Sequence, residues 1–458
     1  MTTTINNEHK ELNFSSEREQ SQACLNSAEH EKNQGRKVLN VPNKREQNQT
    51  CLDSAEREGL RQKGNVPNLR FPEFRGKWER MKFGDIATGF DYGMNAAAKN
   101  YDGVNKYIRI TDIDETSSTY TDKDIVSPDG VLTDNYLVNN RDILLARTGA
   151  STGKSYLYKK SDGKLYYAGF LIRANVTTHD PYFVFSQLHI HRYWRWVSIM
   201  SARSGQPGIN SQEYASFPIY TTSIEEESKI AKLLSLLDER IATQNKIIED
   251  LKMLKSAIIE NVFDDKHSER LQLDNVGSYI RGLTYSSNNV VEHGGTLVMR
   301  SNNIVNGSLL DYNNNVVFVN KQMSAEQQLQ NGDIVICMAN GSSSLVGKSS
   351  FYDGNCHSPI TVGTFCGIYR SKEPIVKWLF QTNKYRRYIW NSLQGGNGAI
   401  ANLNGEDILN MSFSIPNAPI KDTCVKMLTS VDSALENNIS LCALYTLQKQ
   451  HLLRQMFI

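Results

Sequence analysis

Cysteine is scarce in this sequence, and its spacing suits neither a disulfide framework nor a zinc site. The 458 residues include seven cysteines, and no two of them form a C-x-x-C pair. Paired spacings are typical of zinc ligands and secreted scaffolds, whereas scattered thiols remain reduced in the cytoplasm. His189 and His191 are two residues apart in an expected helix, so they would not share a face as metal ligands. The sequence therefore predicts reduced thiols and no bound metal.

Long hydrophobic runs are absent as well. Mean hydropathy is −0.47, and the longest apolar run, IVICMA at residues 334–339, is far short of the roughly 20 residues that cross a bilayer. The first seven residues lack the basic and apolar segments of a secretory signal. We expect a cytoplasmic protein.

Net charge is small, but positive charge gathers locally. The formal net charge is +2, yet residues 141–203 contain ten Lys or Arg against three acids, and residues 333–402 contain seven against three. Binding to DNA phosphates depends on local rather than total charge. Such stretches are often only solvated faces, but their occurrence in both halves favours a DNA-facing surface in each.

Residues 1–66 differ in kind from the rest. They carry ten basic and ten acidic residues and one aromatic residue, Phe14, and the string CLNSAE at 24–29 recurs as CLDSAE at 51–56. A segment with so little apolar surface does not offset its ordering entropy. We expect a disordered, low-complexity extension.

The remainder contains a two-fold internal repeat. RITDI at 109–113 returns as RSNNI at 300–304, and DIL at 142–144 returns as DIV at 333–335. A repeat of this size predicts two globular modules. The expected fold class is α/β (mixed α+β), with two repeated globular domains separated by two long helices.

The repeat is most regular in its two helices, where apolar residues alternate at spacings of four and three. This spacing is typical of a coiled-coil seam, and every position in the second helix lies 194 residues after its counterpart. Gln244 matches Asn438 and Lys255 matches Lys449, so even the polar interruptions recur. Each helix would run roughly 50 Å. The alternative is a pair of unrelated amphipathic helices on separate cores. The seam positions are Ile230, Leu234, Leu237, Ile241, Gln244, Ile248, Leu251, Lys255, Ile258 and Val262, then Cys424, Leu428, Val431, Leu435, Asn438, Cys442, Tyr445, Lys449, Leu452 and Met456.

A Gly-Lys-Ser string occurs once in each module. A phosphate-binding loop places four residues between its first glycine and Gly-Lys-Ser. The first copy, at 149–155, has three, and the second, at 341–349, has five. Nucleotide hydrolysis is therefore disfavoured. What remains is a strand that ends in a small hydroxyl-rich loop with one lysine, either an ordinary turn or a loop that approaches a nucleic-acid backbone.

Basic and aromatic residues alternate at 191–196 (HRYWRW) and at 384–390 (KYRRYIW). They could stack on unpaired bases. The favoured alternative is that the aromatic rings fill a core while the arginines lie outside, near phosphates.

Catalysis by the chain alone is not expected. A base-methylating enzyme needs two consecutive prolines in the motif that holds the flipped base. DPYF at 180–183 lacks the second proline, and no glycine-rich cofactor loop follows a strand.

Four segments resemble the specificity subunits of type I restriction-modification enzymes. They are residues 66–79 (VPNLRFPEFRGKWE), residues 142–149 with Gly153-Lys154, the helix from Lys229 to Lys255, and the closing residues 447–457. The sequence departs from the family at Glu226-Glu227, where Glu-Gln is usual, and at residues 420–423, so docking contacts at those points are in doubt.

The resemblance implies one target recognition domain for each half of a split, asymmetric DNA site, with the helices antiparallel and setting the gap. It implies a non-catalytic, DNA-binding subunit whose partners are double-stranded DNA, two methylation subunits and restriction subunits. S-adenosylmethionine, ATP and Mg would be held by those partners, and no cofactor by this chain. A repeat-built coiled-coil scaffold without sequence-specific DNA binding is the alternative function. The expected divisions are 1–66, the extension; 67–218, recognition domain 1; 219–264, spacer helix 1; 265–416, recognition domain 2; and 417–458, spacer helix 2.

The candidate DNA contacts are polar residues near the strand-loop motif and the late glycine-rich turns. Arginine suits guanine edges, and asparagine or glutamine suits adenine. They are Arg147, Thr148, Ser151, Thr152, Lys154, Gln206 and Asn210 in the first module, and Asn340, Ser342, Ser343, Lys348, Gln394, Asn397 and Asn402 in the second.

Overall fold

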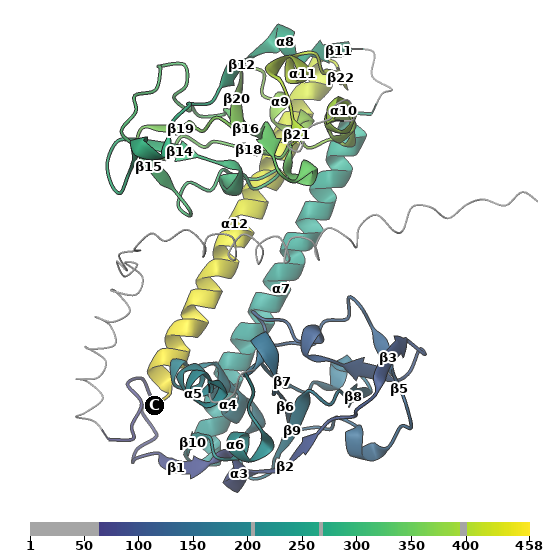
Figure 1. Cartoon of the computed structure of the whole chain (residues 1–458), viewed down its shortest axis with the longest axis vertical. Helices are drawn as coiled ribbons and strands as arrows, with labels where there is room; N and C mark the ends of the chain where they lie inside the picture. Colours follow the sequence, from purple (N-terminus) through teal and green to yellow (C-terminus); the bar gives the residue numbers. More distant parts are fainter. Residues whose placement is uncertain (1–63, 203–206, 265–268, 394–400) are drawn as a thin grey trace, which may run out of the picture. The chain divides into compact units, whose positions relative to one another are not determined.

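The computed structural model describes residues 64–202, 207–264, 269–393 and 401–458 (Figure 1). Contacts divide the chain into residues 1–66 and residues 67–458. The expected disordered extension therefore lies almost wholly outside the described residues. Within the described part, no helix is both long and apolar enough to cross a membrane.

The two globular domains have the same central sheet, in mixed α/β surroundings. In domain 1 the strand order is β2-β9-β6-β7, and in domain 2 it is β12-β20-β16-β18, with every neighbouring pair antiparallel. A short antiparallel pair, β1-β10 or β11-β22, joins the two ends of each domain next to the following helix. The strands of domain 1 are β1 Glu79–Lys82, β2 Ala87–Tyr92, β3 Ala97–Asn100, β4 Lys106–Ile108, β5 Val126–Asp129, β6 Asp142–Ala146, β7 Ser155–Leu157, β8 Leu165–Tyr167, β9 Leu171–Val176 and β10 Pro218–Thr221. Those of domain 2 are β11 Glu269–Gln272, β12 Gly277–Arg281, β13 Val290–Val291, β14 Thr296–Met299, β15 Val317–Val319, β16 Ile334–Cys337, β17 Ala339–Asn340, β18 Ser349–Phe351, β19 Ile360–Val362, β20 Cys366–Ser371, β21 Ala401–Asn402 and β22 Ser412–Ile415.

The central strand of each sheet is buried on both faces. In β6, Ile143 and Leu145 belong to one core, and Leu144 and Ala146 belong to another, because alternate side chains of a strand point to opposite faces. Short helices cover the first face, and the parallel pair β4-β8 covers the second. Domain 2 repeats this arrangement, with β14-β19 as its parallel pair. The short α-helices are α3 Phe83–Ile86, α4 Pro181–Ser186, α5 His191–Ser201, α6 Ser211–Ala215, α8 Leu273–Val276, α9 Val376–Leu379, α10 Asn383–Leu393 and α11 Gly405–Leu409.

The DPYF string is a helix start. Asp180 caps α4 by accepting hydrogen bonds from the backbone N–H groups of Tyr182 and Phe183, and Pro181 is the first helical residue. Aspartate followed by proline suits this position because a carboxylate satisfies free N–H groups and proline has none to satisfy.

Two helices of 39 residues each, α7 Ile224–Val262 and α12 Ala418–Met456, lie side by side (Figure 1). Their contacts show that they are antiparallel: Lys255 Nζ lies 2.7 Å from Asp432 Oδ1, and Lys449 Nζ lies 2.5 Å from Asp238 Oδ1. At about 1.5 Å per residue each helix is roughly 58 Å long. Each domain packs at one end of the pair: Trp78 and Phe183 of domain 1 lie with Leu234 and Met456, and Trp378 of domain 2 lies with Ile259 and Leu428.

Most apolar seam positions expected from the sequence are buried or half-buried, but the two helix ends depart from the expected register. Ile258 and Leu452 are only partly buried, whereas their neighbours Ile259 and Leu453 are 3% and 8% exposed. Ile259 packs on the core of domain 2 and Leu453 on the core of domain 1. At these ends the globular domain, rather than the other helix, selects the buried face, so the prediction of Ile258 and Leu452 as seam residues was wrong there.

Candidate nucleic-acid interface

In each domain the loop that follows the central strand is tied to the segment that precedes the next short helix. Thr148 pairs with Gly208 in domain 1. In domain 2, β17 pairs with β21, which sets Ala339 opposite Asn402 and Asn340 opposite Ala401. The strand-loop motif and the late turn, far apart in the sequence, therefore meet in both domains.

The Gly-Lys-Ser strings are packing devices. Gly153 and Gly347 have φ of +94° and +81°, and an added Cβ would lie 2.8 Å from Val197 and Ile389, respectively. The hydroxyl groups of Tyr193 and Tyr385 donate to the carbonyl oxygens of these glycines at 2.8 Å. Glycine is needed because a helix lies directly against the loop. The near-match to a phosphate-binding loop thus has a structural cause.

The interleaved aromatic and basic residues divide between core and surface. Tyr193 and Tyr385 are buried, as the core-filling interpretation expected, whereas Trp194 and Trp390 are 43% and 64% exposed. Arg192 differs from the expectation that the arginines lie outside. Its guanidinium donates to Gln187 Oε1 at 3.1 Å and lies 4.4 Å from the centre of the Tyr220 ring, and burial lowers its pKa to about 10.

In domain 1, Arg147 is held beside an aromatic ring that the sequence did not single out. Its guanidinium lies 4.6 Å from the centre of the Tyr92 ring, and Nη1 donates to the Gly169 carbonyl at 3.4 Å. Tyr92 is 42% exposed, and its hydroxyl accepts from the backbone N–H of Ser211 at 3.3 Å. This pairing positions a planar cation at the surface, as bidentate recognition of a base edge requires.

Three other candidates in domain 1 have partners within the domain. Lys154 pairs with Glu115 at 2.6 Å, with 16% and 80% of the two side chains exposed. Thr152 is buried and donates to the Gly149 carbonyl at 2.8 Å, and Asn210 caps α6 by accepting from the Glu213 N–H at 2.9 Å. Thr152 therefore holds the loop instead of facing a partner, because its hydroxyl is already bonded and enclosed. Ser151 and Thr148 are partly exposed on the same loop.

In domain 2 the candidates border a groove of about 780 Å³. Ser343, Lys348 and Asn402 line it together with Arg386 and Trp390 of α10. Burial raises the pKa of the Cys337 thiol against the opposing effect of nearby Lys348, so this cysteine is kept protonated beneath the loop. The groove combines a lysine, an arginine, an amide and an exposed ring, which is a donor set suited to nucleic acid.

Asn340 and Ser342 organise the loop at the edge of this groove. Asn340 Oδ1 accepts from the Ser342 N–H at 3.0 Å, and its Nδ2 donates to Ser301 Oγ at 3.3 Å. The Ser342 hydroxyl lies 2.8 Å from that of Ser344. The candidates Gln206, Gln394 and Asn397 lie outside the described residues.

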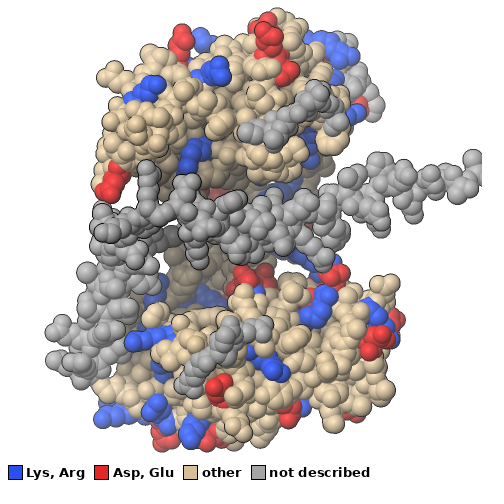
Figure 2. All heavy atoms as spheres, in the orientation of Figure 1, with Lys and Arg blue, Asp and Glu red and all other residues tan. Residues whose placement is uncertain are grey.

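Part of the positive charge counted in the sequence is used inside the domains. Arg173 pairs with Asp91 at 3.1 Å, Arg370 with Asp333 at 2.7 Å and Lys377 with Asp432 at 2.8 Å. Figure 2 shows lysine and arginine side chains spread over both domains on this face, with acidic side chains among them. The basic stretches are therefore smaller as a DNA-facing charge than the counts indicated.

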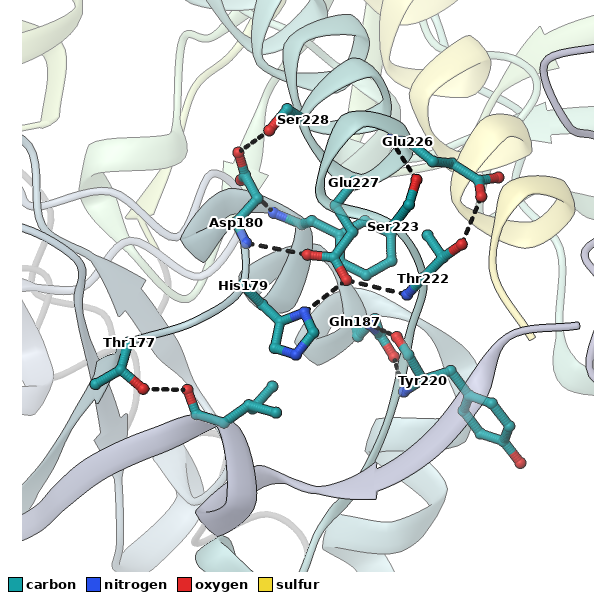
Figure 3. A network of polar contacts seen from close by, with 12 residues as sticks. Thr177, His179, Asp180, Gln187, Tyr220, Thr222, Ser223, Glu226, Glu227 and Ser228 are labelled. Atoms are coloured by element: carbon teal, nitrogen blue, oxygen red, sulfur yellow. Dashed lines mark hydrogen bonds and ion pairs between the residues drawn. The ribbon is translucent and has the colours of Figure 1, made fainter. Parts of the chain in front are cut away.

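A second polar cluster lies where α7 begins (Figure 3). Glu227 is fully buried and accepts from the backbone N–H groups of Asp180 and Thr222 at 3.0 and 3.1 Å, and His179 Nδ1 lies 2.9 Å from it. Glu226, also fully buried, binds the Arg70 guanidinium through both carboxylate oxygens at 2.6 Å. These acids fasten the helix to domain 1 and to the segment before it, so they are structural rather than docking residues.

Domain 2 has the same fastening with the charges reversed. Lys421 and Glu373, which lie 194 residues after Glu227 and His179, form an ion pair at 3.1 Å. The departure from the expected sequence at residues 420–423 is thus matched by a compensating change in the domain.

The described residues contain no group of three or more His, Cys, Asp or Glu arranged to hold a metal. Within that part of the chain, all five cysteines are free thiols.

This architecture defines a class of protein: two related α/β modules carried on one antiparallel helix pair, each presenting a polar loop at its surface. Residues 75–253 match the family model of the type I restriction modification DNA specificity domain. These residues are such a domain, and the chain has the fold of a type I specificity subunit.

Relatives and a solved structure support this assignment. Over 155 residues the chain is 35% identical to the type I restriction enzyme EcoKI specificity subunit of Escherichia coli K12, which covers 32% of this chain and 31% of that protein. Over 217 residues it is 26% identical to the MjaVIII specificity subunit of Methanocaldococcus jannaschii, covering 45% and 47%. These alignments span about a third to a half of the relatives' own length. The type I restriction-modification S subunit from M. genitalium aligns with a TM-score of 0.57 at 14% identity, over 86% of this chain and 99% of that one, and so shares the fold.

Proposed function

We propose that this chain is the DNA specificity subunit of a type I restriction-modification complex, in which each domain reads one half of a bipartite, asymmetric site. The observation that carries the proposal is the doubled domain with unlike reading side chains. Arg147 and Met338 occupy equivalent positions, since their N–H groups donate to Phe170 and Phe365 and their carbonyls accept from Ile209 and Leu403. Tyr92 and Arg281 likewise precede the matching bridge residues Met94 and Leu283 by two positions. Two frameworks that agree while their surface side chains differ suit two different half-sites.

The helix pair is the proposed docking surface for two methylation subunits, with restriction subunits joining outside them. Met253, Leu444 and Leu447 are 71%, 61% and 56% exposed on the long helices. Exposed apolar residues on one element mark a surface that a partner covers. S-adenosylmethionine, ATP and Mg would be bound by those partners, and this chain would supply the address.

Base-resolved methylation of DNA exposed to the assembled complex tests this proposal. We expect modified adenines in a two-part motif with a fixed gap, whereas a single contiguous motif would contradict the two-domain reading.

Binding measurements separate this function from a scaffold without DNA recognition. Replacing Arg147 and Lys154 by glutamine removes two cations from the loop, so affinity should fall and the slope of log K against log salt should become shallower by about 1 to 2. Lys99→Gln is the matched control, because Lys99 is half-exposed beside Asp129 in the same domain. Unchanged affinity and slope in the double variant would favour the scaffold.

A further inference from the structure

One aromatic residue is exposed at the same place in both domains. Phe170 precedes β9 and Phe365 precedes β20, and they are 61% and 63% exposed. Their carbonyl oxygens accept hydrogen bonds from the N–H groups of Arg147 at 3.0 Å and Met338 at 2.8 Å, the first residues after the central strands. Each phenylalanine is therefore one hydrogen bond from the start of the candidate recognition loop.

The turns that carry these rings are fixed from both sides. In domain 1 the Leu171 N–H donates to Ala168 at 2.8 Å, and the Gly169 N–H donates to Met94 at 2.8 Å. In domain 2 the Cys366 N–H donates to Gly363 at 2.9 Å. The residues that follow, Leu171 and Cys366, are buried. A closed turn between buried residues holds each ring outward, although burial would be more favourable for so large an apolar side chain.

The ring stays the same where neighbouring side chains change. Arg147 in domain 1 is replaced by Met338 in domain 2, and Tyr92 by Arg281, yet phenylalanine occupies the turn in both. Side chains that read bases should differ between two half-sites, whereas a contact that ignores sequence should be shared. The shared ring therefore suits a sequence-independent contact.

The surroundings favour DNA over a protein surface as the occupant. Phe365 borders a hollow of about 450 Å³ that Arg300, Ser301 and Asn302 also line, and Ser301 bonds Asn340 of the recognition loop. In domain 1 the guanidinium of Arg147 lies beside the turn that carries Phe170. A lone ring among cationic and amide groups resembles the apolar wedges that enter a base step while polar neighbours hold the backbone, and differs from the contiguous apolar patch of a protein interface.

We propose that Phe170 and Phe365 are DNA wedges, one in each recognition domain, which insert at a base step beside each half-site regardless of its sequence. This inference rests on the proposed function, because it requires each domain to lie on a half-site.

The test uses the full chain assembled with its methylation subunits and a duplex carrying the site that the wild-type complex modifies. Phe170→Ala and Phe365→Ala should each weaken binding roughly tenfold, as the loss of one stacking contact does. The salt slope should be unchanged because no charge is removed. Phe→Trp at either position should restore affinity. Val131→Ala and Val290→Ala, at positions 81% and 48% exposed, are the controls and should bind like wild type.

The outcomes are distinguishable. Wild-type affinity in both alanine variants, at a site that the wild-type complex modifies, overturns the wedge and leaves the proposed function intact. Weakened assembly with the methylation subunits, with normal DNA affinity once assembled, also overturns it and assigns the rings to a protein interface. If the wild-type complex modifies no two-part site, the proposed function itself fails.

Discussion

Asp432 of α12 is a buried carboxylate with three donors. It lies 2.7 Å from Lys255, 2.8 Å from Lys377 and 3.1 Å from the indole nitrogen of Trp378, and it is 4% exposed. Burial lowers the pKa of Lys255, and Asp432 opposes that shift. One acid therefore joins both long helices to domain 2.

Asp432→Ala should destabilise the protein by about 3 to 5 kcal/mol, because it leaves two lysines together without their counter-ion. Urea unfolding of the full chain measures the loss. Glu249→Ala is the control, since it removes an exposed pair with Lys252 and should cost at most about 1 kcal/mol. Equal effects of the two substitutions would show that burial is not what makes the Asp432 contact important.

His189 provides a pH-dependent contribution. Its ring is enclosed between Phe185 O at 2.9 Å and Ser118 Oγ at 3.0 Å, and burial lowers its pKa from 6.5 to about 4. Between these values the unfolded chain binds more protons than the folded one, so stability rises with pH. The contribution is complete above about pH 6.5 and is lost as the pH falls towards 4.

From pH 7.5 to pH 5 we expect His189 to reduce the free energy of unfolding by about 2 kcal/mol. Urea unfolding at both pH values should show a smaller loss for His189→Gln than for wild type. The exposed His451 gives the matched variant, His451→Gln, which should keep the wild-type difference. A His189→Gln protein with the full wild-type pH response would remove His189 as its source.

At the scale of the helices, the contacts follow an internal two-fold relation. Asp238 and Lys255 become Asp432 and Lys449 when 194 is added, so the two inter-helix ion pairs are equivalent. Gln244 and Asn438, also 194 apart, bond to each other and so lie on the axis that relates the two halves. The polar interruptions of the seam are therefore partners in register.

Gln244→Leu alone should destabilise the chain by about 1 to 2 kcal/mol, because the Asn438 carboxamide oxygen loses its donor. Adding Asn438→Leu should recover that loss, since an apolar pair replaces a polar one within the seam. Urea unfolding of the single and double variants provides the cycle. Strictly additive losses would show that the two side chains do not act as a pair.

The sequence was informative where the pattern is local. Alternating spacings predicted both helices, and their common offset predicted that they match. The partners of Lys255 and Lys449 were not predictable, because Asp432 and Asp238 lie 177 and 211 residues away and the antiparallel pairing was needed to bring them together. For the same reason the strand order could not be inferred from short strands alone.

At the candidate interface the sequence located the loops but misjudged some of their side chains. Arg147 and Lys348 lie where DNA contacts were expected, whereas Thr152 is enclosed and Lys154 is paired with Glu115. Residue type indicates which hydrogen bonds a side chain can make, and only the fold determines whether they are already made. Tyr92, Phe170 and Phe365 carry no motif, but aligning the two modules through their turns would have paired the phenylalanines.

For the whole molecule, the helix pair should set the distance between half-sites. Inserting one heptad into each helix, beside Gln244 and beside Asn438, keeps the seam in phase and lengthens the pair by about 10 Å. At about 3.4 Å per base pair, the gap in the modified motif should grow by about three base pairs. Methylation mapping of the assembled complex measures the gap.

Insertion into one helix alone is the control, because it shifts the ion pairs out of register and should destabilise the chain. An unchanged gap in a stable double insertion would mean that the domains, not the helices, set the distance.

The reversed fastenings at the helix starts limit how the two halves can be recombined. His179 meets Glu227 in the first half, and Glu373 meets Lys421 in the second. If the second domain were moved onto the first helix, Glu373 would face Glu227, and two acids would meet in a buried position. A gene rearrangement that exchanges recognition specificities therefore keeps a sound joint only if its crossover lies inside the helix, so that the unit of inheritance is a domain together with the first turn of the helix that follows it.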